Sequence, residues 1–121
     1  MNYKAIKIDF DDTGFVTADG TLLFGKKFKT VLSFHEPGIA PVEEESGWYY
    51  INTEGKDIFE KRYKRAFGFY CGLACVVDFS DKWFFINLNG EKISEDFIWC
   101  GNYCEGYAVV CSANGEYCHI D

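Results

Sequence analysis

Short stretches of apolar residues alternate with turn-forming residues along much of the chain. Residues 74–79 form an apolar, β-branched run that predicts a strand, and residues 82–87 predict the returning strand after a turn at Ser80-Asp81. Asn89-Gly90 predicts a hairpin turn, because both residues readily adopt positive φ. A short third strand is expected at 91–94. The pattern therefore predicts a three-stranded antiparallel meander.

The same pattern returns every 34–35 residues. An alanine within a Gly-x-Ala-x-Val pattern begins three units, and extrapolation towards the N-terminus gives a fourth, so the units start near Ala5, Ala40, Ala74 and Ala108. A glycine column and a β-branched column keep the same period, namely Gly20, Gly55, Gly90 and Val16, Ile51, Ile86, Ile120. Several columns at one period predict tandem repeats. We expect residues 1–121 to form a single repeat domain whose last unit is a half unit.

About ten residues separate successive meanders, and these carry aromatic side chains at repeated positions. The two columns are Phe28, Tyr63, Phe97 and Phe34, Phe69, Tyr103. One meander is too small to bury its apolar face alone, so neighbours must stack. We expect these rings to pack one meander against the next, the alternative being a platform for stacking bases. The predicted fold class is all-β, with the meanders stacked as a solenoid-like array or a partial propeller.

Two segments resemble the WG repeat, a unit common in bacterial proteins. They are Gly47-Trp48-Tyr49-Tyr50-Ile51-Asn52 followed by Gly55-Lys56, and Lys82-Trp83-Phe84-Phe85-Ile86-Asn87 followed by Gly90-Glu91. Residues 103–110 resemble the second half of the unit. The chain departs from the family after the Trp, where Tyr49 and Phe84 replace the signature Gly, while Gly14 keeps it. The resemblance implies a bacterial or phage-type scaffold, usually read as protein-binding, with no catalytic residues to carry over.

Composition and charge narrow the functional classes. The chain is 48% hydrophobic and 19% aromatic, which is enough to build a core. Its formal net charge of −7 opposes binding to a nucleic-acid duplex or an anionic membrane. The first ten residues lack the apolar core of a secretory signal, and no apolar run approaches the roughly 18–20 residues that span a bilayer. We expect a cytoplasmic, acidic protein.

The basic residues gather at equivalent positions of two units. The candidate binding residues are Lys26, Lys27, Lys29, Lys61, Arg62, Tyr63, Lys64 and Arg65. If equivalent positions lie side by side, these residues form one basic ridge, whereas the acidic residues gather in the hairpin turns and give a bipolar molecule. The ridge is predicted to bind a phosphate-bearing ligand or an acidic surface through its arginines. The alternative is solvated charge that keeps an aromatic-rich protein soluble.

The sequence gives little support for metal or catalytic chemistry. Six cysteines lie in the C-terminal half, at positions 71, 75, 100, 104, 111 and 118. We expect reduced thiols that pack as small apolar groups, with zinc binding or a disulfide as the alternatives. The Cys-x3-Cys spacing is wider than a typical zinc knuckle. The two histidines, His35 and His119, occupy different parts of the unit, and no known catalytic motif is present. We predict no cofactor, no metal and no enzyme.

Two functional hypotheses from different classes remain. The first is a non-catalytic protein-interaction module built from the repeats. The second is a small-ligand binder that holds an anionic, nucleotide-like molecule at the basic ridge. A repeat array also predicts an unpaired strand edge. We expect such an edge to be covered by an aromatic-rich loop or by another subunit, which would give a homo-oligomer.

Overall fold

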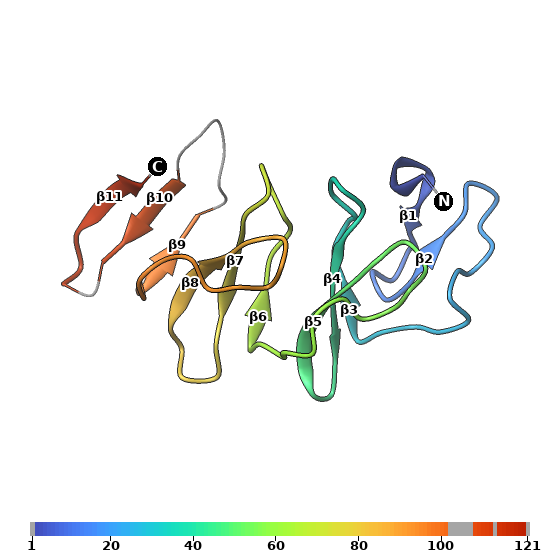
Figure 1. The fold of residues 1–121 in the computed structure, drawn as a ribbon. Helices are drawn as coiled ribbons and strands as arrows, with labels where there is room; N and C mark the ends of the chain where they lie inside the picture. The colour runs from blue at the N-terminus through green and yellow to red at the C-terminus, as the bar shows by residue number, and fades with distance from the viewer. Residues whose placement is uncertain (1, 102–107, 113, 121) are drawn as a thin grey trace.

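The computed structural model describes residues 2–101, 108–112 and 114–120. Within them the fold is all-β, apart from a short 3-10 turn, η1 (Tyr3–Ala5). The strands are β1 (Lys7–Ile8), β2 (Phe15–Val16), β3 (Thr30–Val31), β4 (Ala40–Glu44), β5 (Gly47–Ile51), β6 (Arg65–Ala66), β7 (Ala74–Val77), β8 (Trp83–Ile86), β9 (Trp99–Cys100), β10 (Ala108–Cys111) and β11 (Tyr117–Ile120). Their hairpins follow one another along one axis, from the blue N-terminal end to the red C-terminal end (Figure 1).

Three of the sheets repeat one arrangement. Their strand orders are β3-β4-β5, β6-β7-β8 and β9-β10-β11, and every neighbouring pair is antiparallel. The predicted tandem three-stranded sheets are confirmed, but the third strand precedes its hairpin instead of following it. The strand expected at 91–94 is reduced to a single bridge between Ile86 and Lys92. The residues before each hairpin supply the third strand, because β3, β6 and β9 pair antiparallel with the first strand of the hairpin that follows.

Single residue pairs join one sheet to the next. The Tyr63 N–H donates to the Trp48 carbonyl at 2.9 Å, and the Trp48 N–H donates to the Tyr63 carbonyl at 2.8 Å. Two residues later, Arg65 pairs with Val77 of the following hairpin. Trp83 and Phe97 make the equivalent junction, with hydrogen bonds of 3.0 and 2.7 Å. Tyr63 and Phe97 therefore pair with the last strand of one repeat, and the strand that opens the next repeat begins two residues later.

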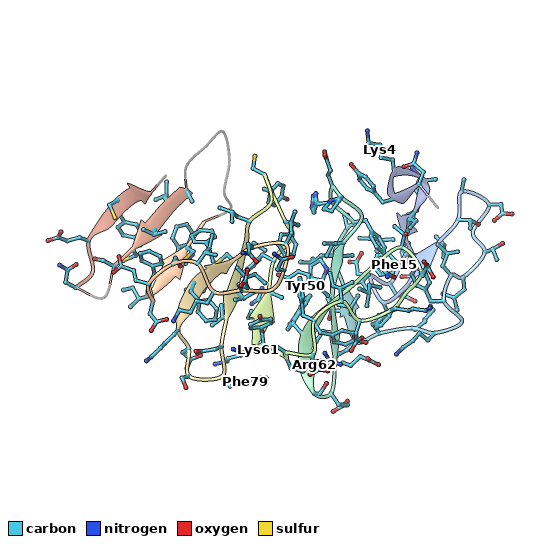
Figure 2. All side chains as sticks on the ribbon, in the orientation of Figure 1. Lys4, Phe15, Tyr50, Lys61, Arg62 and Phe79 are labelled. Carbon is cyan, nitrogen blue, oxygen red and sulfur yellow. The ribbon has the colours of Figure 1, made fainter. Side chains whose placement is uncertain are left out.

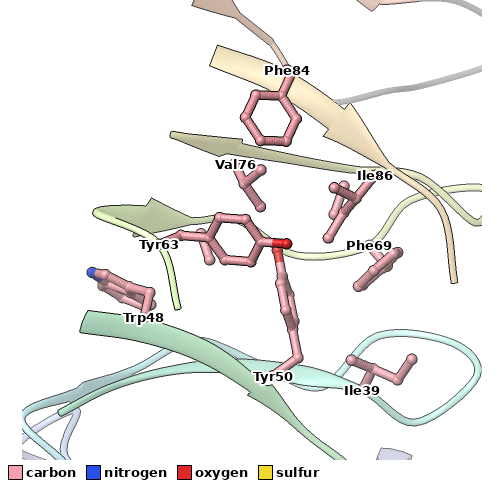
Figure 3. Close-up of a cluster of buried hydrophobic side chains, with 10 residues drawn as sticks. Ile39, Trp48, Tyr50, Tyr63, Phe69, Val76, Phe84 and Ile86 are labelled. Atoms are coloured by element: carbon pink, nitrogen blue, oxygen red, sulfur yellow. The ribbon is translucent and has the colours of Figure 1, made fainter. Parts of the chain in front are cut away.

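The aromatic columns form the core between repeats. Phe28, Tyr63 and Phe97 are 5%, 1% and 4% exposed, and Phe34 and Phe69 are also buried. Figure 3 shows the rings of Tyr50 and Tyr63 meeting inside one cluster, between side chains of two successive hairpins. Tyr103 lies outside the described residues. The expectation that these rings pack one repeat against the next is confirmed for the described members.

The glycine column has a packing reason. Gly55 and Gly90 take positive φ of 79° and 78° in their hairpin turns. The rings of Phe24 and Phe59, each from the preceding part of the chain, lie directly against them. A Cβ at Gly90 would lie 2.7 Å from Cδ1 of Phe59, so Gly55 and Gly90 are needed both for the turn and for close approach of a ring, whereas Gly20 is needed for its positive φ alone.

An asparagine side chain closes each of these two turns. The Asn52 side-chain oxygen accepts the backbone N–H groups of Glu54 and Lys56, at 2.9 and 3.1 Å. Asn87 does the same for Asn89 and Glu91, at the same two distances. Asparagine favours such turns because its side chain imitates a backbone carbonyl. The family-like pattern of Ile-Asn followed three residues later by Gly therefore encodes one turn.

The first unit differs from the expectation. Ala5 lies in the 3-10 turn η1 and not at the head of a strand. Val16 pairs with Lys7, although its counterpart Ile51 pairs with Ala40. The first hairpin is shorter, because 9 positions separate the paired residues Lys7 and Val16, whereas 11 separate Ala40 and Ile51. In its turn the Asp9 carboxylate accepts the N–H of Thr13 at 3.0 Å. The alanine column thus marks paired strands in the last three units alone.

Replacement of the signature glycine leaves the strands regular. Tyr49 pairs with Val42, and Phe84 pairs with Val76, in uninterrupted antiparallel ladders. Both rings are buried, with 3% and 4% exposure. An aromatic side chain at this position therefore adds core packing where the family has a glycine.

Candidate functional site

The two basic segments do not form one ridge. Lys29 lies beside β4, because its N–H donates to the Glu43 carbonyl at 2.8 Å, whereas Tyr63 lies beside β5. The whole β4–β5 hairpin therefore stands between them. At about 4.8 Å per strand, the segments are about 14 Å apart. The prediction that equivalent positions lie side by side is wrong, because every repeat inserts a hairpin between them.

Carboxylates of the hairpin turns neutralise most of the candidate basic residues. Five of the seven cations have a carboxylate within ion-pair distance, in the pairs Lys26–Glu44, Lys27–Asp9 and Asp11, Lys29–Glu43, Arg62–Asp57 and Lys64–Asp81. Acidic and basic side chains therefore alternate in space, and the expected bipolar molecule is wrong. A hairpin reaches back to the basic segment before it, because β3 and β6 pair with the first strand of the hairpin that follows.

The remaining candidate residues have different environments. Tyr63 is 1% exposed, so its ring offers no accessible face to a ligand. The guanidinium carbon of Arg65 lies 5.2 Å from the centroid of the Phe67 ring. Lys61 is exposed and makes no ion pair with the described residues; Figure 2 shows it with Arg62 at the same side of the sheets as Phe79. The structure therefore leaves Lys61 alone as an exposed, uncommitted cation of the predicted ridge.

Residues 95–99 occupy the positions that the basic residues 61–65 have in the preceding repeat, but they include Glu95 and Asp96. This change exchanges the two members of an ion pair. Arg62 binds Asp57 at 2.8 Å and lies over the ring of Tyr49, 3.9 Å from its centroid. One repeat later, Asp96 replaces the arginine and Lys92 replaces Asp57. These two residues form an ion pair of 2.6 Å.

The lysine of the exchanged pair also takes over the ring contact. Lys92 lies 4.7 Å from the centroid of Phe84, the counterpart of Tyr49. The cation–ring contact is thus kept, although the charge in each column is reversed. Reversal of the charges between the two repeats therefore keeps both the ion pair and the cation–ring contact.

A row of four aromatic rings crosses the C-terminal sheets. Phe67 and Trp83 stack with centroids 5.8 Å apart and planes 20° apart. Trp83 and Trp99 are 6.3 Å apart, and Trp99 and Tyr117 are also 6.3 Å apart. Exposure rises along the row, reaching 40% at Trp99 and 71% at Tyr117. We call Phe67, Trp83, Trp99 and Tyr117 the aromatic row.

Substitutions in two columns expose the middle of this row. Trp99 stands where the preceding repeats have Thr30 and Arg65, and Gly101 stands where they have Leu32 and Phe67. A Cβ at Gly101 would lie 3.2 Å from the Trp99 ring, so the missing side chain lets this ring lie close to the sheet. The result is an open hollow of about 360 Å³ lined by Phe67, Trp83, Trp99, Cys100 and Gly101.

Two further hollows lie between the preceding equivalent loops. One is lined by Leu32, Ser33 and His35 on one loop and Phe67, Gly68 and Tyr70 on the next. The other is lined by Glu36, Pro37, Cys71, Gly72 and Leu88. The His35 and Tyr70 rings lie 4.5 Å apart, and burial lowers the pKa of His35. The first hollow also carries the hydroxyl groups of Ser33 and Tyr70, and the second carries the Glu36 carboxylate and the Cys71 thiol.

The cysteines of the described chain are free thiols. Cys75, Cys100 and Cys111 are buried, and Cys71 and Cys118 are exposed. A hydrogen bond with Cys100 and burial raise the pKa of the Cys75 thiol, so it stays protonated. Cys104 lies outside the described residues. Within the described part of the chain, no group of three His, Cys, Asp or Glu side chains could hold a metal ion.

Sequence analysis missed the aromatic row. The signal was present in the columns, because Trp99 breaks a polar column and Gly101 breaks an apolar one in the same copy. Reading each column for its exceptions would have found the exposed ring. Knowing that Trp83 and Tyr117 flank Trp99 required the strand pairing of two neighbouring sheets.

The repeated sheets and their shared junctions define a tandem β-repeat protein. Residues 50–83 match the family model of the WG containing repeat. This segment is 34 residues long and runs from β5 to the first residue of β8, which is one full period of the observed array. The predicted resemblance to the WG repeat family is confirmed by this match. Searches against curated proteins and against solved structures gave no match.

No helix within residues 2–101, 108–112 and 114–120 has the length and apolar character required to cross a membrane.

Proposed function

We propose that this repeat protein is a non-catalytic module that binds another protein through the aromatic row. The observation that carries the proposal is the exposure of Trp99 and Tyr117 within a continuous series of ring contacts. Aromatic residues are enriched in the buried centres of protein interfaces, and Trp and Tyr supply many of their energetic hot spots. A row of such rings held by two neighbouring sheets offers a rigid contact surface.

The scaffold suits recognition better than chemistry. The rings project from β6, the start of β8, β9 and the start of β11, and β-ladder hydrogen bonds fix those backbones. A partner would meet side chains whose positions are set before binding, which lowers the entropy lost on association.

The alternative of an anionic ligand at the basic residues has less support. Five of the seven cations of segments 26–29 and 61–65 face carboxylates, and Tyr63 is buried. An anion would have to displace these carboxylates before it could bind. The aromatic row needs no such displacement.

The test is a selection of binding peptides from an unbiased display library, followed by measurement of Kd. We expect Trp99→Ala to weaken the selected peptides about tenfold or more, as for a hot-spot side chain. Phe10→Ala is the matched control, since Phe10 is a fully exposed ring in the first turn. Its Kd should match that of the wild type. Equal Kd values for wild type and Trp99→Ala, with both folded by circular dichroism, would reject the proposal.

A further inference from the structure

The net negative charge of the protein lies in the C-terminal part of its sequence. Residues 67–121 contain eight Asp and Glu, two Lys and no Arg. This part of the chain therefore carries six of the seven net negative charges, whereas residues 1–66 are nearly neutral. All four rings of the aromatic row belong to the acidic part. A partner that covers these rings would meet a negative field, which steers a cationic segment towards them.

The two lysines of the acidic part are already committed. Lys82 and Lys92 both bind Asp96, at 3.8 and 2.6 Å. Glu95 and Glu116 are exposed and have no cation within ion-pair distance among the described residues. Glu116 directly precedes Tyr117 of the row, and Glu95 lies four residues before Trp99. Glu95 and Glu116 thus lack a cation, whereas Asp96, which is closer to Trp99 in sequence, is paired with both lysines.

Several aromatic rings, including Phe67 at one end of the row, are covered by cations of the same chain. Lys26 lies 4.8 Å from the Phe28 centroid, and Arg65 lies 5.2 Å from the Phe67 centroid. Tyr49 and Phe84 are covered by the cations of the exchanged ion pairs described above. Within the described chain, no Lys or Arg lies over Trp83, Trp99 or Tyr117.

The repeat columns make this difference specific. Trp99 occupies the column in which the preceding repeat has Arg65. In the next repeat Trp99 replaces the arginine and Gly101 replaces Phe67, so Trp99 contacts Trp83 and Tyr117 and has no cation over it among the described residues. Trp is the aromatic side chain that binds cations best, and the planar guanidinium of Arg also stacks on it.

We infer that the aromatic row binds a basic protein segment and that an arginine of this segment stacks on Trp99 and Tyr117. The inference rests on the proposed function, because it specifies the chemistry of the partner at the same surface. The guanidinium lies against the two rings, and neighbouring basic residues of the segment face Glu95 and Glu116. Contact with rings and with carboxylates makes binding dependent on both the shape and the charge of the partner side chain.

Three synthetic peptides test the inference by fluorescence anisotropy. Each is a fluorescein-labelled 12-mer of glycine and serine with four identical residues at matched positions: arginine, lysine or citrulline. Citrulline keeps the shape of arginine without its charge. We expect the arginine peptide to bind best, the lysine peptide several-fold more weakly, and the citrulline peptide about tenfold more weakly or worse. Equal binding of the arginine and citrulline peptides would overturn the inference.

Variants assign the effect to the surface. Trp99→Ala should weaken the arginine peptide about five- to tenfold, and Phe10→Ala should leave it unchanged. The double variant Glu95→Gln/Glu116→Gln should weaken binding of the arginine peptide. It should also make the Kd less dependent on salt between about 50 and about 300 mM NaCl, because the Debye length shortens over this range. Binding that survives Trp99→Ala unchanged would also overturn the inference, because the peptide would then bind elsewhere on the acidic surface.

The display selection separates this inference from the proposed function. Selected peptides that are neutral or acidic, yet lose affinity in Trp99→Ala, would reject a basic partner and keep the module. Selected peptides whose affinity ignores Trp99→Ala would reject the module itself. Basic, arginine-containing peptides that lose affinity in Trp99→Ala support both.

Discussion

The ring of Phe59 lies against Gly90 so closely that a Cβ at position 90 would come within 2.7 Å of its Cδ1 atom. The two residues belong to neighbouring repeats, since Phe59 follows the β4–β5 hairpin and Gly90 lies in the turn after β8. Phe24 and Gly55 make the same contact one repeat earlier. A position that the sequence shows as a turn glycine is therefore also a contact between repeats.

We expect Gly90→Ala to lower the free energy of unfolding by about 2–4 kcal/mol, because it combines positive φ with displacement of a ring. Gly20→Ala is the matched control. Gly20 also takes positive φ, at 87°, but a Cβ there would meet no atom within 4 Å. It should lose about 1 kcal/mol. Urea denaturation measures both, and equal losses would show that the ring contact contributes nothing.

The exchanged ion pairs predict that charge can be swapped between columns. Asp57→Lys should lower the free energy of unfolding by about 0.5–1 kcal/mol, because the new side chain faces Arg62. Adding Arg62→Asp should restore most of it, because the pair then copies Lys92 and Asp96 of the next repeat. A double-mutant cycle by urea denaturation gives the coupling. A double variant no more stable than Asp57→Lys would contradict the prediction.

The two buried tyrosines should respond in opposite directions to loss of the hydroxyl. The Tyr50 hydroxyl donates to the Phe67 carbonyl at 2.6 Å, whereas the buried Tyr63 hydroxyl has no hydrogen-bond partner among the described residues. Tyr50→Phe should lower the free energy of unfolding by about 1 kcal/mol. Tyr63→Phe should leave it unchanged or raise it by up to about 1 kcal/mol. Thermal unfolding of the two variants checks the contrast.

His35 should make stability depend on pH near neutrality. Burial lowers its pKa in the folded state below the ordinary 6.5, so the unfolded state binds more protons as the pH falls below that value. Stability is therefore greatest above about pH 6.5 and declines towards the lower folded-state pKa. The carboxylates with lowered pKa, Asp9, Glu44 and Asp96, act in a more acidic range.

The measurement is the urea midpoint between about pH 5 and 7, the interval in which an ordinary histidine titrates. The His35→Asn variant should show a flatter dependence than the wild type. An identical slope in both proteins would assign the effect to another group.

Thiol accessibility should divide the described cysteines into two groups. Cys71 and Cys118 are exposed, whereas Cys75, Cys100 and Cys111 are buried. A brief treatment of the native protein with N-ethylmaleimide should label the first group and spare the second, as peptide mass spectrometry would show. Labelling of all five at the same rate would mean that the buried sheets open readily. Urea should abolish the protection.

Sequence periodicity predicted the repeated sheets because each unit must present the same turn and the same core residues. Gly90, Ile86 and Phe97 keep their columns for those local reasons. The position of the third strand was not predictable in this way. Arg65 and Ala66 pair with β7 in a strand of two residues, which is too short to produce an alternating pattern.

The candidate site was harder to predict than the fold. The basic residues were identified correctly as a periodic group, but the partners of Lys26, Lys29 and Lys64 lie on the following hairpin. Chain spacing alone could not show that a hairpin separates segments 26–29 and 61–65. Trp99 emerged as important after strand pairing placed it between Trp83 and Tyr117.

The junctions between repeats have a mechanical consequence. Each is a single residue pair, Trp48 with Tyr63 or Trp83 with Phe97, joined by two backbone hydrogen bonds. Those bonds run across the strands and so lie near the direction in which the hairpins succeed one another. A pull along that direction would load them one pair at a time, as in a zipper, and not all together, as in shear. The array should extend in steps of one repeat, at low force, and recover each step when the force is released.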